Sequence, residues 1–221
     1  MAGETGDGNK HIETNSAMSP KYKLTYFDLR GLAEPLRFLL AYGDIEYEDS
    51  RFTFEQWPEM KKSMPFGKVP VLEVDGQALH QSMAMTRYFA KQLKLTGDDD
   101  WEAMLCDIMV DTMNDFRMQV TGYYYEPNEE TKEKKKEVLF NETMPFYLER
   151  LDEEVKKNDG HFVKGKLTWA DLAIVAMIDF MEDQLQTKFT DNYSNLKAIK
   201  EKVLDLPQIK AWVERRPKTN Y

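Results

Sequence analysis

Short strands alternate with helices in the first half of the chain, and their order is the feature that most limits its fold. Apolar and β-branched runs predict a strand, a helix, a second strand, a short helix and a third strand, over residues 23–27, 35–42, 45–52, 54–62 and 69–74. Asp75-Gly76 then suits a tight turn into a fourth strand at residues 77–80, because glycine tolerates positive φ. Ser82 begins another helix. The order β-α-β-α-β-β-α predicts a mixed sheet covered by helices.

Beyond a polar linker at residues 94–100, the pattern changes to long helical stretches with few β-branched runs. The expected helices cover residues 101–124, 131–158, 168–182, 192–203 and 208–215. Thr168 and Asp171 have the spacing of a capping box, which predicts a structural role at the start of one helix. We expect three parts along the chain: a disordered N-terminal extension, an α/β domain and an all-helical domain, at residues 1–20, 21–95 and 101–221.

Charge and composition narrow the range of partners. The 221 residues include 30 basic and 39 acidic side chains, and the net charge of −9 argues against nucleic acid or an anionic membrane as the main partner. No unbroken apolar run reaches about 18 residues, so the sequence predicts no membrane span. The single cysteine, Cys106, cannot form an internal disulfide, and the three histidines form no cluster that resembles a zinc site. We expect a cytoplasmic protein that acts on small molecules.

Tyr26 is the first candidate for chemistry. It stands at the end of the first strand, immediately before the loop at residues 28–32, and ligands of open α/β sheets bind beyond the carboxyl ends of strands. A phenol with an ordinary pKa of about 10 stays protonated at neutral pH and can donate a hydrogen bond to a thiolate or an oxyanion. The alternative is that Tyr26 is only a half-buried strand aromatic.

Pro70 precedes the third strand in the segment Gly67-Lys-Val-Pro-Val71. An X-Pro bond at this point is open to both isomers, and sequence alone favours trans. The element order with a proline at this position resembles thioredoxin-like domains. In those domains the proline is cis and shapes the ligand site, so the resemblance implies a cis bond here.

Further motifs extend a resemblance along the chain. They are Tyr-Phe followed by Arg-Gly and Ala-Glu-Pro, Trp57, Pro65-Phe-Gly-Lys-Val-Pro-Val-Leu72, His80-Gln-Ser82, and Thr-Trp-Ala-Asp in the helical half. In this order and spacing they resemble sigma-class cytosolic glutathione transferases, especially insect members, from about Tyr22 to the C-terminus. The resemblance implies an α/β thioredoxin-like N-terminal domain, which binds glutathione, followed by an all-α C-terminal domain.

The resemblance implies that Tyr26 hydrogen-bonds the glutathione sulfur, which lowers the pKa of the thiol and supplies a thiolate to attack an electrophilic carbon. It also implies a set of glutathione-binding residues: Trp57, Lys61, Gly67, Lys68, Val69, Gln81 and Ser82. The first two match positions that contact the glycine end, the next three match the extended backbone that pairs with the cysteinyl part, and the last two match residues that hold the γ-glutamyl carboxylate at a helix N-terminus. Without the resemblance, these residues read as a core aromatic, solvated lysines, a loop and a helix cap.

Three aspartates at positions 107, 111 and 115 follow one another at i, i+4 spacing and share a helix face, which is usually a solvated stripe. In the family, the position of Asp115 reaches the glutathione bound by the neighbouring subunit, so the resemblance implies a homodimer with shared sites. Some vertebrate relatives hold a divalent metal in this region. This chain has Asn114 in place of one of the carboxylates, and we predict no metal.

Leu32 stands where some relatives carry arginine near the thiol, which predicts an apolar wall for the second-substrate pocket. The candidates for that wall are Phe27, Leu32, Met118, Tyr123 and Tyr124. The methionine and the tyrosines fit core packing equally well. Cys106 falls inside a later helix, and we expect a buried, inert thiol there.

The leading hypothesis is a glutathione transferase that conjugates glutathione, as its co-substrate, to hydrophobic electrophiles. Lipid-peroxidation aldehydes are candidate substrates, and peroxidase activity is a candidate side reaction. Two alternatives stay open. Some sigma-class members isomerise a prostaglandin endoperoxide as prostaglandin D synthases, and sigma-like sequences serve as non-catalytic lens crystallins in cephalopods.

Overall fold

A four-stranded sheet forms the centre of the first half of the molecule in the computed structural model, which describes residues 21–219. The predicted N-terminal extension lies outside the described residues. The strands are β1 (Tyr22–Phe27), β2 (Glu48–Phe52), β3 (Val71–Val74) and β4 (Gln77–His80). They lie in the order β2-β1-β3-β4. The β1 and β2 strands are parallel, whereas β3 is antiparallel to both β1 and β4. The predicted mixed sheet is confirmed.

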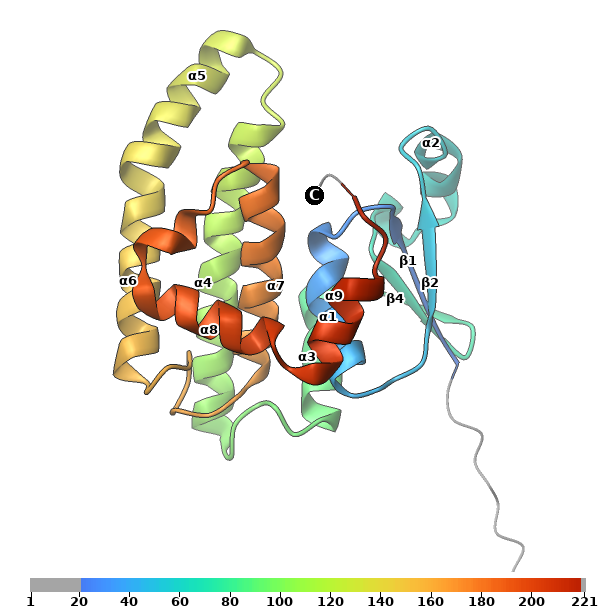
Figure 1. Ribbon diagram of the computed structural model, residues 1–221. Helices are drawn as coiled ribbons and strands as arrows, with labels where there is room; N and C mark the ends of the chain where they lie inside the picture. The colour runs from blue at the N-terminus through green and yellow to red at the C-terminus, as the bar shows by residue number, and fades with distance from the viewer. Residues whose placement is uncertain (1–20, 220–221) are drawn as a thin grey trace, which may run out of the picture.

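The helices of this half are α1 (Glu34–Tyr42), α2 (Trp57–Met60) and α3 (Ser82–Gln92), with short 3-10 turns η1 (Gly31–Ala33), η2 (Lys61–Ser63) and η3 (Pro65–Gly67). Figure 1 shows α1 and α3 between the sheet and the long helices of the second half. The second strand begins later than the predicted residue 45. The amide of Ile45 instead donates to the carbonyl of Leu40 at 2.9 Å, so this segment closes the end of α1 before the strand can start.

The second half is helical among the described residues. Its elements are α4 (Asp100–Tyr124), α5 (Glu129–Val138), the π-helical turn η4 (Leu139–Thr143), α6 (Met144–Lys157), α7 (Trp169–Gln184), the 3-10 turn η5 (Phe189–Asn192), α8 (Ser194–Leu204) and α9 (Pro207–Arg215). The helix predicted at residues 131–158 is present from Glu129 to Lys157, but the π-helical turn η4 interrupts its α-helical hydrogen bonding. Pro145 follows this turn and has no amide hydrogen to donate to the preceding turn of helix.

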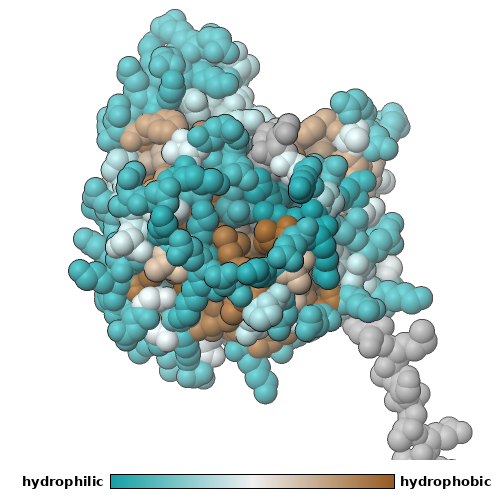
Figure 2. All heavy atoms as spheres, viewed as in Figure 1, coloured by the Kyte–Doolittle hydropathy of each residue, from teal (hydrophilic) through white to brown (hydrophobic). Residues whose placement is uncertain are grey.

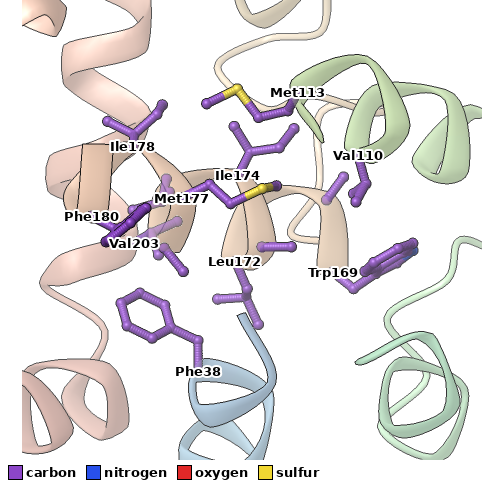
Figure 3. Close-up of a cluster of buried hydrophobic side chains, with 14 of the residues drawn as sticks. Phe38, Val110, Met113, Trp169, Leu172, Ile174, Met177, Ile178, Phe180 and Val203 are labelled. Carbon is purple, nitrogen blue, oxygen red and sulfur yellow. The ribbon is translucent and has the colours of Figure 1, made fainter. Parts of the chain in front are cut away.

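Helix α7 is the centre of the helical half. Nearly every residue along it is buried, which is the composition of a helix surrounded by other elements. Figure 3 shows Phe38 of α1 pointing toward Leu172 of α7. Val110 of α4 and Val203 of α8 also lie around α7 in this view. Figure 2 shows the opposite character at the outer end of α5, which is hydrophilic throughout. Between residues 21 and 219, no helix has both the length and the apolar composition to cross a bilayer.

The Val69–Pro70 bond is cis. The trans isomer that sequence alone favours is therefore wrong, and the cis isomer that the thioredoxin-like resemblance implies is the one observed. Isolated X-Pro bonds prefer trans by only about 0.5–1 kcal/mol, a difference that the surrounding structure can override.

The predicted capping box is formed at the start of α7. One carboxylate oxygen of Asp171 accepts a hydrogen bond from the Thr168 amide at 2.7 Å, and the other accepts one from the Phe162 amide at 2.9 Å. Asp171 is fully buried, so these two amides have no access to water. The aspartate therefore fixes both the start of α7 and the loop that leads to it.

We predict that Asp171→Ala lowers the free energy of unfolding by about 2–4 kcal/mol, because it leaves buried amides without an acceptor. Asp99 is a matched control: it caps α4 by accepting from the Glu102 amide at 2.8 Å, but it is exposed. Its replacement by alanine should cost about 1 kcal/mol. Urea unfolding of both variants at one protein concentration measures the difference, and equal losses would contradict the role of burial.

Candidate active site

Tyr26 lies near the end of β1 with its side chain buried beneath the following loop. Its hydroxyl oxygen accepts a hydrogen bond from the backbone amide of Leu32 at 3.1 Å. A phenol can accept in this way and still donate its own hydrogen to a third group. The loop therefore orients the hydroxyl without using its single donor.

Gly31 allows the loop to close over this hydroxyl. Its φ is +42°, and a Cβ added there would lie 2.7 Å from the Tyr26 hydroxyl oxygen and 2.6 Å from Cδ1 of Leu29. Both the backbone conformation and the space require glycine at this position. The Arg-Gly pair of the sequence thus has a physical function beside the phenol.

The surroundings of Tyr26 affect its ionisation in opposite directions. Burial raises the pKa of its hydroxyl, whereas the Leu32 amide and the positive charges of Arg37 and Arg117 lower it. The net direction is upward, so the phenol stays protonated throughout the neutral range. The Arg37 guanidinium carbon lies 5.9 Å from the centre of the Tyr26 ring.

A pocket of about 400 Å³ opens beside this loop. The residues that line it are Leu32, Phe66, Lys68, Val69, Pro70, His80, Gln81 and Ser82. Five of them were predicted site residues, and Leu32 connects the pocket to Tyr26 because its amide holds the hydroxyl. Phe66, Pro70 and His80 were not predicted, although each is adjacent in sequence to a residue that was.

The backbone is unusual on two sides of the pocket. Gln81 has a φ of +75° and Phe66 a φ of +53°, and non-glycine residues adopt such angles only where the surrounding structure enforces them. Gln81 immediately precedes α3, and its conformation sets the direction in which the chain enters the helix. The first amides of α3, which begin at Ser82, have no carbonyl partner within the helix. Phe66 is 84% exposed, and its ring lies 5.0 Å from the ring of His80.

Three other predicted glutathione-binding residues lie close to one another near α2. The side chain of Lys61 covers Gly67, where an added Cβ would lie 3.3 Å from Cε of the lysine. Trp57 stacks on Phe52 with a centroid distance of 5.8 Å and an interplanar angle of 16°. Trp57, Lys61 and Gly67 are not among the described residues that line the 400 Å³ pocket. The structure places these three residues beside the pocket rather than in its lining.

Of the five predicted wall residues, Leu32 is the one among the described residues that line this pocket. The ring of Phe27 packs against Phe54 and Trp57 at centroid distances of 4.6 and 5.3 Å. The Phe27 ring also lies edge-on to the ring of Tyr26, with a centroid distance of 5.7 Å. On α4, Met118 is exposed, Tyr123 packs edge-on against Phe140 and Tyr124 packs edge-on against Tyr125.

The predicted acidic stripe follows the surface of α4. Asp107 pairs with Arg87 of α3 at 2.7 Å, while Asp115 is exposed. Asp115 is not among the described residues that line the pocket of its own chain. Across residues 21–219, histidine, cysteine and acidic side chains nowhere gather in a group of three that could hold a metal ion. Cys106 is buried within α4, and burial raises the pKa of its thiol to about 11.

Arg117 of α4 is a partly buried cation near Tyr26 that the sequence analysis did not single out. Its Nε donates to Asn114 at 3.0 Å and its Nη1 to Thr121 at 3.2 Å. Burial lowers the pKa of Arg117, and interaction with Tyr26 counteracts this, which places its charge within reach of the phenol. In the sequence, an arginine on a polar helix face looks like any solvated cation.

Comparison with known proteins agrees with this architecture. Residues 22–91 match the family model of the glutathione S-transferase N-terminal domain, and residues 114–216 match that of the glutathione S-transferase C-terminal domain. A glutathione S-transferase of Anopheles gambiae is 48% identical over 200 residues, covering 90% of this chain and 98% of the relative. Glutathione S-transferase S1 of Drosophila melanogaster is 48% identical over 198 residues, covering 90% and 80%.

Among solved structures, prostaglandin synthase D of Nilaparvata lugens superimposes with a TM-score of 0.88 at 44% identity, covering 90% of this chain and all of that one. The two family models match the sheet half and the helical half in the order in which the structure joins them. The chain belongs to the glutathione S-transferase family.

Proposed function

We propose that this chain conjugates glutathione to hydrophobic electrophiles and that Tyr26 stabilises the reacting thiolate. The observation that carries the proposal is the buried phenol, which stays protonated and is oriented by the Leu32 amide at 3.1 Å. Leu32 also lines the 400 Å³ pocket, so a glutathione sulfur bound in that pocket would lie near the residue whose amide orients the Tyr26 hydroxyl.

In the proposed mechanism, the Tyr26 hydroxyl donates its hydrogen bond to the glutathione sulfur and lowers the pKa of the thiol. The thiol proton leaves to solvent. The thiolate then forms a carbon–sulfur bond with the second substrate: it displaces halide from an aryl halide, or it adds to the β-carbon of an unsaturated aldehyde, whose α-carbon then takes up a proton from solvent. The charges of Arg37 and Arg117 act on the same region, as their effect on the pKa of Tyr26 indicates. Preorganised donors and charges of this kind stabilise an anion without rearranging during the reaction.

The predicted binding residues suit the three parts of glutathione. Ser82 and the amides at the start of α3 offer a site for the γ-glutamyl carboxylate, with Gln81 beside them. Lys68 and Val69 line the pocket before the cis-proline and offer extended backbone to the cysteinyl part. Trp57 and Lys61, near α2, are assigned to the glycine end.

The electrophile is assigned to the apolar side of the loop at Leu32, with Met118, Tyr123 and Tyr124 of α4 as further wall candidates. Lipid-peroxidation aldehydes fit an apolar wall with positive charge nearby, and reduction of organic hydroperoxides is a side activity of the same thiolate. The second candidate function is isomerisation of a prostaglandin endoperoxide, which the likeness to prostaglandin synthase D of Nilaparvata lugens favours.

We further infer a sigma-class homodimer in the cytosol. Asp115 is exposed and outside the pocket lining of its own chain, so a role in glutathione binding requires a second subunit. An apolar hollow of about 500 Å³ between α4 and α6, with Ile108 and Phe146 exposed at its edge, supports an interface on this side of the molecule. The free, buried Cys106 suits a reducing compartment.

Tyr26→Phe should lower kcat/KM for glutathione conjugation about 100-fold or more, with glutathione binding retained, because only the donor to the thiolate is removed. The substrates are an aryl halide and 4-hydroxynonenal. Tyr22→Phe is the matched control: it is the same change on the same strand, and the Tyr22 ring packs edge-on against Phe89 at 5.2 Å. The control should keep native activity.

Equal activity of Tyr26→Phe and the native chain would reject the thiolate role of the phenol. If the native chain converts a prostaglandin endoperoxide much faster than either electrophile, the isomerase function replaces conjugation. Absence of any glutathione-dependent turnover in the native chain would favour a non-catalytic, crystallin-like role.

Shared sites can be tested with a heterodimer of Tyr26→Phe and Asp115→Ala subunits, co-expressed with different tags. One site then has both defects, and the other has an intact Tyr26 from one subunit and an intact Asp115 from its partner. At limiting glutathione each parent homodimer should lose about tenfold or more, since a charge-assisted hydrogen bond contributes about 1.5–3 kcal/mol. The heterodimer should regain about half of the native activity. Activity equal to the mean of the parents, or failure to recover a heterodimer, would contradict shared sites.

A further inference from the structure

Arg216, immediately after α9, joins two carboxylates from different parts of the chain. Its Nη1 donates to Oε1 of Glu34 at 2.9 Å, and its Nη2 donates to Oδ2 of Asp179 at 2.7 Å. The three side chains are 11%, 0% and 15% exposed. A planar guanidinium can span two acceptors at once in this way, whereas a lysine ammonium acts as a point charge.

The first carboxylate leads to the loop that follows Tyr26. The second oxygen of Glu34 accepts from Nη1 of Arg37 at 3.2 Å. The same nitrogen donates to the backbone carbonyl of Leu29 at 2.9 Å and lies 3.4 Å from that of Arg30. Arg37 is fully buried, and in the described contacts it is the donor to the Leu29 carbonyl, whereas the Arg30 carbonyl also accepts from the Glu34 amide at 3.1 Å.

The second carboxylate reaches the same loop from its other side. Oδ2 of Asp179 accepts from Nη1 of Arg30 at 2.9 Å, and Nη2 of Arg30 donates to Asp183 at 2.8 Å. The Arg30 side chain is only 5% exposed. Its position is therefore determined by α7 rather than by solvent.

Both routes end at the few residues that orient the phenol. Leu29 and Arg30 immediately precede Gly31 and Leu32. Gly31 packs directly against the Tyr26 hydroxyl, and the Leu32 amide donates to that hydroxyl. A shift of this segment moves the Leu32 amide that holds the hydroxyl, and the loop lies so close that a Cβ added at Gly31 would be 2.7 Å from the hydroxyl oxygen. Arg216 touches neither Tyr26 nor the residues of the 400 Å³ pocket in any described contact.

We propose that Arg216 is a positioning residue for glutathione activation: by bridging Glu34 and Asp179 it fixes the loop that aims the Tyr26 hydroxyl at the sulfur. The inference rests on the proposed function of Tyr26. It assigns to the residue that follows α9 an effect on the chemistry of a site formed at the end of β1. A cation that only stabilises the fold would not change the pKa of bound glutathione, whereas the proposed role of Arg216 requires such a change.

The test measures the pKa of enzyme-bound glutathione from the ultraviolet absorbance of its thiolate across a pH series. Arg216→Met should raise that pKa by about half to one unit, which is about a threefold to tenfold loss of thiolate at neutral pH. Arg216→Lys should also raise the pKa, but by less, with about a twofold loss of thiolate at neutral pH. Lysine can pair with one carboxylate but cannot bridge both. Lys210→Met is the control, because Lys210 is an exposed cation of α9 that pairs only with the exposed Asp205 in the described contacts.

Tyr26→Phe belongs in the same series and separates two kinds of failure. If Tyr26→Phe raises the thiol pKa and neither Arg216 variant does, Arg216 serves stability alone and the inference is wrong. If Tyr26→Phe itself leaves the thiol pKa unchanged, the proposed function of Tyr26 is at fault. Should Arg216→Met fail to fold, Arg216→Lys decides the question: a native thiol pKa in that variant overturns the proposal.

Discussion

The buried carboxylate of Glu34 is the constraint on which the arrangement of the two halves depends. Its side chain is fully buried at the start of α1, and a charge in such surroundings persists only when it is paired and hydrogen-bonded. Oε1 accepts from the Trp212 indole and from Arg216, and Oε2 accepts from Arg37. Two of these donors come from α9 and the residue that follows it, and the third comes from α1 itself, so the packing of α9 against α1 and the orientation of Arg37 must satisfy the carboxylate together.

Arg37 connects this constraint to the phenol. Burial alone would lower the pKa of Arg37, but Glu34 and Asp49 act in the other direction and raise it overall. The guanidinium therefore stays charged while it neutralises Glu34 and hydrogen-bonds the loop. The same charge lowers the pKa of Tyr26 against the effect of burial. One cation thus contributes both to the stability of the domain contact and to the electrostatics of the candidate site.

Local patterns made the strand order, the hairpin at Asp75-Gly76 and the position of Tyr26 predictable, because turn chemistry and side-chain alternation act over a few residues. The Glu34–Arg216 contact joins residues 182 positions apart, and in the sequence Glu34 looks like an ordinary first-turn acid. The start of β2 was misplaced for a related reason: the Ile45 amide has a helix carbonyl as its partner, which strand propensity does not take into account. Which side chains share the pocket depends in the same way on how distant segments pack.

The residues that line the 400 Å³ pocket come from the sheet half, and two of them oppose local backbone preference. Phe66 and Gln81 have positive φ, which non-glycine residues keep when the surrounding structure over-determines it. Gly31, in the loop after Tyr26, also has positive φ, which glycine adopts readily. At the loop after Tyr26, that support comes from Asp179 and Asp183 of α7 and from the end of α9, none of which lines the pocket. The helical half therefore supplies the charged partners of the loop that follows Tyr26, and the arrangement around the phenol depends on contacts between both halves of the chain.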